Sequence, residues 1–237
     1  RYELHQAMGK VYTELNNYPK SFQHFYEALS IRQSEFPNKY YSNIGIDRSI
    51  TRIYLKTEQF NLAIKHCKKL LEFKDSIRPD NGTKFALLNQ FIGWLCYKNE
   101  QYELAFQYCT IALNIYNNQV DTHELDCITV LNYLGNIALK LHQYGKAWNY
   151  CTTSMTRLEM VNQGVKYKLI ANHYELFGNI SFNCNDKILG YNCYRRALEI
   201  LSTIKPVPHN DIKRVRQSLN RSNYSLLHIF NTPAPIV

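Results

Sequence analysis

The sequence has no run of 18 apolar residues, and this absence excludes a conventional membrane-spanning helix. It also has no block of five or more basic residues, although its formal net charge is +9. Its seven cysteines form no C-x-x-C motif, and they are not an even number at the close spacing of a small disulfide-linked fold. They therefore do not indicate a disulfide framework. We therefore expect a protein of a reducing, cytoplasmic compartment that does not enter a membrane.

The motifs that mark common catalytic and nucleotide-binding sites are also missing. No G-x-G-x-x-G, P-loop, H-E-x-x-H or G-x-S-x-G pattern occurs. The nearest His/Cys neighbours are His66 with Cys67 and His123 with Cys127, and no second pair stands at the spacing of a zinc site. A Cys/His/Asp nucleophilic arrangement stays open, but cysteines on apolar helix faces are typical of inert thiols. We predict no catalysis in this segment, no cofactor and no metal.

What the sequence does have is a repeat with a period of about 42 residues, in the range of known repeat proteins. An aromatic residue, an alanine, a cysteine and a glycine each recur at that spacing. A period of this size is typical of stacked supersecondary units, which form a solenoid. The four columns are Tyr18, Phe60, Tyr102 and Tyr144; Ala63, Ala105 and Ala147; Cys67, Cys109 and Cys151; and Gly9, Gly93, Gly135 and, one residue late, Gly178.

Each repeat has the pattern of two amphipathic helices joined by a tight polar turn. In the third repeat, apolar residues recur at helical spacing from Leu87 to Cys96, stop over residues 98–101, and resume from Tyr102 to Tyr116. No alternation typical of β-strands competes with this pattern. The sequence therefore predicts an all-α fold.

The glycine column predicts where the helices approach each other. A glycine inside a helix costs about 1 kcal/mol relative to alanine, so its recurrence indicates close helix–helix contact. Thr51 stands at the equivalent position of the second repeat. We expect large side chains such as Phe25 and Tyr194 to fill the space beside the small residues.

These patterns together resemble a known repeat class. A glycine in the first helix, an aromatic residue at the turn and alanines in the second helix form the signature of the tetratricopeptide repeat (TPR). It is seen in Met8-Gly9…Tyr12…Tyr18…Phe25…Ala28 and in Ile92-Gly93…Tyr102…Ala105…Ala112. The resemblance implies a right-handed superhelical solenoid of antiparallel helix pairs, with about five repeats and a C-terminal capping helix.

The resemblance extends over nearly the whole chain. The 42-residue form is similar to the repeats of kinesin light chains, most clearly over residues 102–116, whereas the loops Ser34-Glu35-Phe36-Pro37 and Asp121-Thr122-His123-Glu124 replace the Gly-x-(Asp/Glu)-His-Pro loop of that group. The fifth repeat is the most degenerate. We expect one array over residues 1–230, with repeats at about 2–40, 41–82, 83–124, 125–167 and 168–208, a capping helix at 209–230, and a tail at 231–237.

In this repeat class the first helix of each pair lines a concave groove. The resemblance implies that the residues three before and one after the glycine column face that groove, followed one turn later by a column of lysines. Amides there can pair with a peptide backbone, arginines can bind carboxylates, and a tryptophan can act as an anchor. The predicted peptide-binding groove consists of Gln6, Lys10, Arg48, Arg52, Lys56, Gln90, Trp94, Lys98, Asn132, Asn136, Lys140, Glu175, Asn179, Gln217 and Arg221.

We therefore expect a non-catalytic scaffold or adaptor that binds an extended peptide of a protein partner, one with acidic character. Three alternatives stay open. The groove residues are merely solvated; the chain is an RNA-binding solenoid, which the net charge of +9 favours and the tyrosine packing columns disfavour; or it is a sensor or targeting region of a larger enzyme or regulator. Because the chain opens at Arg1 within a helical pattern, we expect a piece of a longer protein. The partner's identity and the oligomeric state are not predicted.

Overall fold

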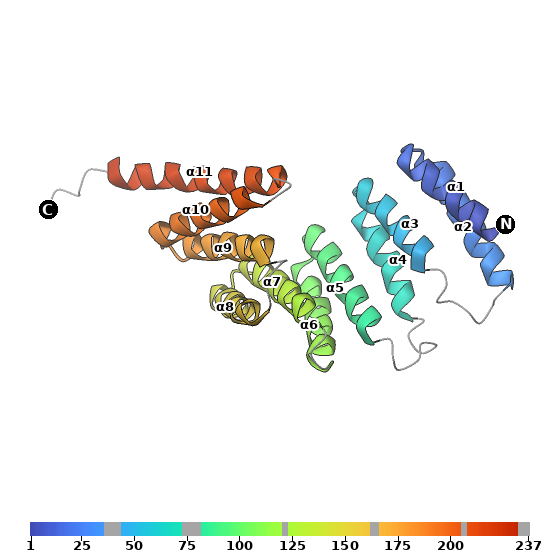
Figure 1. The fold of residues 1–237 in the computed structure, drawn as a ribbon, viewed down its shortest axis with the longest axis horizontal. Coiled ribbons are helices and arrows are strands. Elements are labelled where there is room, and N and C mark those ends of the chain that lie inside the picture. Colours follow the sequence, from blue (N-terminus) through green and yellow to red (C-terminus); the bar gives the residue numbers. More distant parts are fainter. Residues whose placement is uncertain (36–43, 73–81, 120–122, 162–165, 205–207, 232–237) are drawn as a thin grey trace. The chain divides into compact units, whose positions relative to one another are not determined.

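The computed structural model describes residues 1–35, 44–72, 82–119, 123–161, 166–204 and 208–231. These residues form eleven α-helices, and no strand occurs among them (Figure 1). The all-α prediction is confirmed. The helices are α1 (Tyr2–Glu14), α2 (Tyr18–Glu35), α3 (Ile44–Lys56), α4 (Phe60–Glu72), α5 (Gly82–Lys98), α6 (Tyr102–Asn117), α7 (Glu124–Lys140), α8 (Tyr144–Met160), α9 (Lys166–Asn183), α10 (Lys187–Thr203) and α11 (His209–Asn231).

The chain divides into two compact units, residues 1–101 and residues 102–237. In the first unit α1 packs on α2, α3 on α4, and α4 on α5. In the second, α6 packs on α7, α7 on α8, and α9 on α10, while α11 lies against α10. Each helix therefore packs chiefly on its neighbours in the sequence, as in a repeat solenoid. The exact repeat boundaries and the handedness of the array stay predictions.

The turns within the helix pairs share one backbone device. A single residue in each turn has a left-handed conformation, with φ between 56° and 65°. The N–H of the next residue donates to a carbonyl five positions back, for example from Gln143 to Ala138 at 2.8 Å. This pattern is the Schellman ending of a helix, which satisfies its last carbonyls and reverses the chain within a few residues. The left-handed residues follow the period of the sequence repeat, with the last one position late: Asn16, Glu58, Glu100, His142 and Asn185.

The glycine column marks close helix contacts, as predicted. A Cβ atom added to Gly9 would lie 2.6 Å from the Phe25 ring, and one added to Gly178 would lie 2.7 Å from the Tyr194 ring. Both rings are buried, with exposures of 0% and 4%. An aromatic ring of the second helix therefore occupies the space that the glycine of the first helix leaves free.

The alanine and cysteine columns lie in the core, also as predicted. Ala63, Ala105 and Ala147 are completely buried, and the three cysteines of the repeat column are at most 1% exposed. Burial raises the pKa of the Cys67 thiol to about 11, against a smaller lowering by its hydrogen bond with Thr51. A thiol with that pKa is protonated and unreactive near neutral pH.

The last helix closes the second unit. It was predicted at residues 209–230 and spans His209–Asn231. Its Val215 is 1% exposed and packs in one cluster with Ala171, Tyr194 and Ala197 of α9 and α10. The predicted tail falls almost entirely on residues 232–237, outside the described residues. None of the described helices combines the length and hydropathy that a bilayer span needs.

Candidate functional site on the first helices

The predicted groove residues lie on the first helix of each pair and, for Gln217 and Arg221, on α11; together they define the first-helix face. Of those with described side chains, none is buried. The side chain of Arg48 lies outside the described residues. The face is thus polar and accessible within each unit, while its role as a peptide-binding groove stays a prediction.

In the first unit this face carries exposed cations. Lys10 lies on α1, Arg52 and Lys56 on α3, and Lys98 on α5, and all four are exposed. No ion pair joins any of them to a carboxylate in the part of the chain that the structure describes. Lys56 and Lys98 are also the last residues of their helices, where a positive charge interacts favourably with the helix dipole.

An aromatic residue lies beside one of these cations. The Nζ atom of Lys98 is 5.9 Å from the centre of the Trp94 ring, within the range of a cation–π contact. Trp94 in turn stacks on Phe91, with ring centres 5.9 Å apart and planes inclined by 14°. The indole is therefore held at the surface, half-buried and available to a ligand on its remaining area.

In the second unit two asparagines on α7 form a pair. Asn136 Nδ2 donates to the backbone carbonyl of Asn132 at 2.9 Å and to its side-chain Oδ1 at 3.1 Å. The Nδ2 atom of Asn132 is buried without a hydrogen-bond partner among the described residues. An unsatisfied buried donor is costly, so this amide gains from any acceptor that can reach it.

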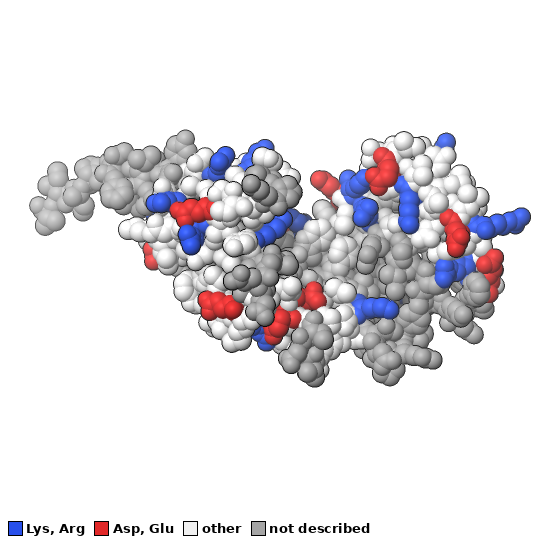
Figure 2. Space-filling model, in the orientation of Figure 1, with Lys and Arg blue, Asp and Glu red and all other residues white. Residues whose placement is uncertain are grey.

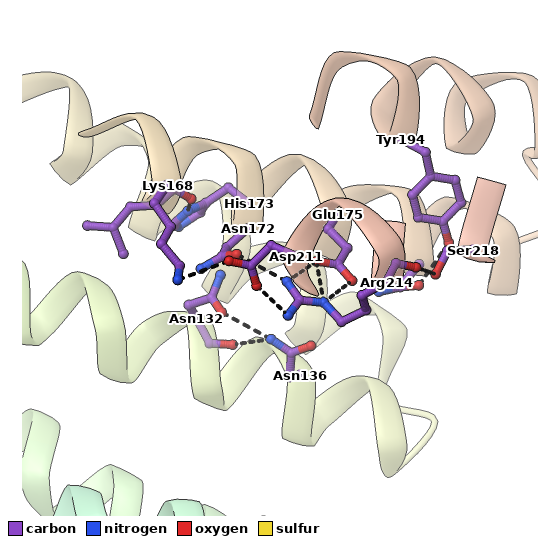
Figure 3. Close-up of polar contacts among 12 residues, drawn as sticks. Asn132, Asn136, Lys168, Asn172, His173, Glu175, Tyr194, Asp211, Arg214 and Ser218 are labelled. Atoms are coloured by element: carbon purple, nitrogen blue, oxygen red, sulfur yellow. Dashed lines mark hydrogen bonds and ion pairs between the residues drawn. The ribbon is translucent and has the colours of Figure 1, made fainter. Parts of the chain in front are cut away.

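In the same unit, α9 and α11 are joined by an ion-pair network (Figure 3). Arg214 Nε and Nη2 donate to the two carboxylate oxygens of Glu175 at 2.8 and 2.7 Å, which is bidentate geometry. The same guanidinium donates from Nη1 to Asp211 at 2.8 Å, and Lys168 Nζ lies 3.0 Å from the other oxygen of Asp211. Glu175, the one acid among the predicted groove residues, is therefore neutralised within the chain.

The network also affects the ionisation of Asp211. Partial burial alone would raise the pKa of this carboxyl, but hydrogen bonds and charges from Lys168 and Arg214 outweigh it and leave the pKa below its ordinary value. The hydrogen bond with Glu175 raises the pKa of Arg214 despite partial burial. Asp211 and Arg214 are therefore both charged at neutral pH.

The other predicted residue on α9 has a structural contact. Tyr194 donates its hydroxyl hydrogen to Asn179 Oδ1 at 2.8 Å, and Asn183 donates to the backbone carbonyl of Asn179 at 2.8 Å. The side-chain carbonyl oxygen of Asn179 is thus engaged with α10. Gln217 on α11 is exposed, as is Arg221.

Sequence reasoning missed three partners in this network, namely Lys168, Asp211 and Arg214. The period contained one signal. Arg214 stands 42 residues after Asn172, and its Nη2 lies 3.4 Å from Asn172 Oδ1. Residues one period apart on first helices are neighbours, so following this column into α11 would have brought Arg214 to α9.

Polar groups inside the units were missed as well. His173, fully buried, contacts Ser154 Oγ through Nε2 and the Leu169 carbonyl through Nδ1 at 2.6 Å. Burial lowers the pKa of His173, opposed by the backbone hydrogen bond with Leu169. The Nε2 atom of His66 lies 3.2 Å from Asp47 Oδ1, without the alignment of a hydrogen bond.

Two hollows stand out in the described surface, and both are shallow. One, of about 150 Å³, lies between Tyr116, His123, Cys127 and Arg157 in the second unit. The other, of about 320 Å³, is formed by Arg1, Tyr2, Glu3, Arg32 and Glu35 in the first. Neither has the character of a typical enclosed small-molecule site lined by apolar groups.

Comparison with solved structures decides the fold. BtubC (BKLC) from P. vanneervenii aligns over 90% of this chain and 91% of its own, with a TM-score of 0.63 and 14% identity. The C-terminal part of a TPR repeat-containing protein from Cytophaga hutchinsonii aligns over 92% and 73%, with a TM-score of 0.59 and 15% identity. The fold is that of a tetratricopeptide-repeat solenoid.

A third TPR-like neighbour, the apo form of RapI, aligns over 98% of this chain and 85% of its own, with a TM-score of 0.61 and 15% identity. No protein-family model matches the chain, and no curated protein matches it. At these identities the likeness shows the fold alone. The function has to be argued from the residues of this chain itself.

Proposed function

We propose that this chain is a non-catalytic protein–protein interaction scaffold that binds an extended, acidic peptide of a partner along its first-helix face. TPR solenoids present elongated surfaces of this kind, because each repeat adds one more first helix to the same side. An extended peptide can then contact several repeats at once.

The observation that carries the proposal is the set of exposed cations in the first unit. Lys10, Arg52, Lys56 and Lys98 stand on the first helices without a carboxylate partner among the described residues. Lys56 and Lys98 also stabilise the ends of their helices, but all four cations stay exposed to a ligand, whereas Arg214 on α11 is bound to Glu175. Cations left free in this way attract acidic side chains and increase the rate of encounter with them.

The second unit supports the same ligand with different chemistry. Its face carries Asn132 and Asn136, whose amides suit the carbonyl and N–H groups of a peptide backbone once their mutual hydrogen bond is exchanged for the ligand. The acid of this face, Glu175, is already bound by Arg214 and would not repel an acidic ligand. Within the second unit, the proposed contacts are therefore with the backbone of an acidic peptide, and within the first unit they are with its acidic side chains.

We also propose that the chain belongs to the long-repeat TPR class that includes kinesin light chains. The second helices begin at Tyr18, Phe60, Tyr102 and Tyr144, each one period of the sequence repeat after the one before. This spacing supports membership of the long-repeat class. The loops between the repeats differ from the loop of kinesin light chains, so we do not propose the role of a kinesin light chain.

RNA binding finds less support. On the face drawn in Figure 2, Lys and Arg are interspersed with Asp and Glu. Binding to a phosphate backbone instead requires a continuous basic stripe. The exposed aromatic rings Tyr26, Trp148 and Tyr167 lie on three different helices, which does not make a stacking platform for successive bases.

A selection from a random peptide library tests the proposal. The immobilised chain is exposed to displayed peptides of about a dozen residues, and the bound population is sequenced. We expect enrichment of Asp and Glu over the unselected library, together with affinity that falls as salt rises. Recovery of no peptides, or of peptides without acidic bias, would contradict the proposal. A parallel titration with single-stranded RNA shows whether phosphate binds instead.

A further inference from the structure

Three side chains of the first helix pair converge on one point in the first unit. His5 comes from α1, and His24 and Glu27 come from α2. His5 Nδ1 lies 3.1 Å from His24 Nδ1 and 2.7 Å from Glu27 Oε2, while His24 Nδ1 lies 3.4 Å from the same oxygen. Three atoms that can each donate an electron pair to a metal ion thus lie within 3.4 Å of one another.

A single proton does not satisfy this arrangement. If His5 Nδ1 carries a hydrogen, it can donate that hydrogen to Glu27. The lone pair of His24 Nδ1 must then share the same N–H group, because it has no other donor in this cluster. If both nitrogens carry hydrogens, two N–H groups face each other at 3.1 Å. A cation placed among the three atoms uses all three lone pairs at once.

The distances are close to those that a divalent transition metal requires. Zinc bonds to imidazole nitrogen and carboxylate oxygen are about 2.0–2.1 Å, so in a tetrahedron the ligand atoms lie about 3.3–3.4 Å apart. The observed separations of 2.7, 3.1 and 3.4 Å need small movements of side chains that are all partly solvent-accessible. Two imidazoles and one carboxylate are also a ligand set that zinc and similar ions accept.

Neighbouring side chains hold two of the ligands in position. Gln23 Nε2 donates to Glu27 Oε1 at 3.2 Å, which leaves Oε2 directed at the imidazoles. Tyr12 stacks on the His24 ring, with centres 5.4 Å apart and planes inclined by 4°. Such outer contacts, which fix the orientation of a ligand, are typical of metal sites.

The sequence did not indicate this group, because its members come from two different helices and match no metal motif. The repeat explains how they meet. One period later, the positions of His5 and His24 hold Asp47 and His66, which also face each other, at 3.2 Å. The column thus places polar pairs between paired helices, and the first repeat adds Glu27 as a third ligand.

We propose that His5, His24 and Glu27 form a binding site for one divalent transition-metal ion of the zinc type. The ligand atoms are the two Nδ1 nitrogens and Glu27 Oε2. Three protein ligands leave the fourth tetrahedral position for water or for a group from a partner. The bound ion links α1 to α2 and stabilises the first repeat.

Metal titration of the purified, metal-free chain tests this site. Isothermal titration with ZnCl₂ should give one ion per chain, and Zn²⁺ should raise the melting temperature. The variants His24→Gln and Glu27→Gln should each weaken binding at least tenfold. His142→Asn is the matched control, because His142 is an exposed turn residue that contacts only Tyr144 among the interactions described, and it should leave binding unchanged.

X-ray absorption of the zinc-loaded chain gives a readout that does not depend on the variants. It should show nitrogen and oxygen ligands, including two imidazoles, and no sulfur. Sulfur bound to the metal, the absence of stoichiometric binding, or equal affinities for the wild type and His24→Gln would each overturn the proposal. If His24→Gln does not fold, as circular dichroism would show, the X-ray absorption spectrum of the wild type decides alone.

Discussion

Replacing Gly178 by alanine tests the packing of the repeat directly. A Cβ atom at this position would lie 2.7, 2.8 and 3.1 Å from three atoms of the Tyr194 ring. The ring has little room to retreat, because its hydroxyl donates to Asn179 at 2.8 Å and its face stacks on Phe182 with centres 5.7 Å apart. The substitution therefore forces an overpacked contact in the core.

Two terms of opposite sign set the magnitude. Alanine stabilises a helix interior by about 1 kcal/mol relative to glycine. Overpacking a rigid core costs about 1–3 kcal/mol and, with the ring held on two sides, we take the upper half of that range. The net expectation for Gly178→Ala is a loss of about 1–2 kcal/mol in the free energy of unfolding.

Gly145 supplies the matched control. It lies near the start of α8 and is exposed, and nothing lies within 4 Å of an added Cβ. Gly145→Ala should therefore stabilise the protein by up to about 1 kcal/mol. Urea unfolding followed by far-ultraviolet circular dichroism measures both variants through their midpoints, provided that the slope m stays the same.

A double substitution separates the contact from other effects. If the Tyr194 ring causes the loss, Gly178→Ala should cost less in a Tyr194→Leu background than in the wild type, because the smaller side chain leaves room for the methyl group. Equal stability of Gly178→Ala and Gly145→Ala, or the same cost in both backgrounds, would refute the packing of glycine against ring.

Three further predictions concern the turns, a buried histidine and the first-helix face. Glu100 has a left-handed φ of 59°, so Glu100→Gly should raise the free energy of unfolding by up to about 1 kcal/mol in urea melts, and a loss would show that the turn is not strained. Burial lowers the pKa of His173 in the folded protein, so in acid the unfolded chain binds more protons than the folded one. The free energy of unfolding therefore keeps its full value above the unfolded pKa of about 6.5, and below that pH it falls by up to about 1.4 kcal/mol per pH unit. Melts between pH 8 and 5 should show that decline, and His173→Gln should flatten it. Replacing Asn132 and Asn136 together by leucine should abolish binding of a selected peptide while circular dichroism shows an intact fold, and retained binding would remove these amides from the interface.

The architecture could be predicted from the sequence because a repeat fixes neighbours. Once the period was known, the glycine column was expected at close helix contacts. Phe25 and Tyr194 of the second helices do lie against Gly9 and Gly178, whereas Gly135 meets Leu176 of α9. The capping helix was expected from the resemblance to the repeat class, and its Val215 does pack against Ala171, Tyr194 and Ala197 of the last helix pair.

The polar contacts could not be predicted to the same depth. A period states which positions are neighbours, but the chemistry depends on which side chains happen to meet and in which rotamers. Glu175 was expected to face a ligand and is bound by Arg214 instead, a residue 39 positions later. His5 and His24 meet only because two helices pair, and no local motif records that pairing.

The central claim is that an acidic peptide binds the first-helix face, and one charge-reversal comparison tests it most directly. Lys10→Glu with Arg52→Glu alters this face, whereas Lys20→Glu with Lys65→Glu alters exposed positions on the second helices α2 and α4. Each reversal changes the charge by 2, so both pairs take the formal net charge from +9 to +5.

Affinity for a peptide selected on the wild type is then measured by fluorescence anisotropy at fixed salt. Two lost attractions and two new repulsions, each worth about 0.2–1 kcal/mol at exposed positions, sum to about 0.8–4 kcal/mol and should weaken binding by the first pair at least about fourfold and up to about 700-fold. The second pair should change it less than threefold. Equal weakening by both pairs would mean that only overall charge matters, and no weakening by the first would place the peptide elsewhere.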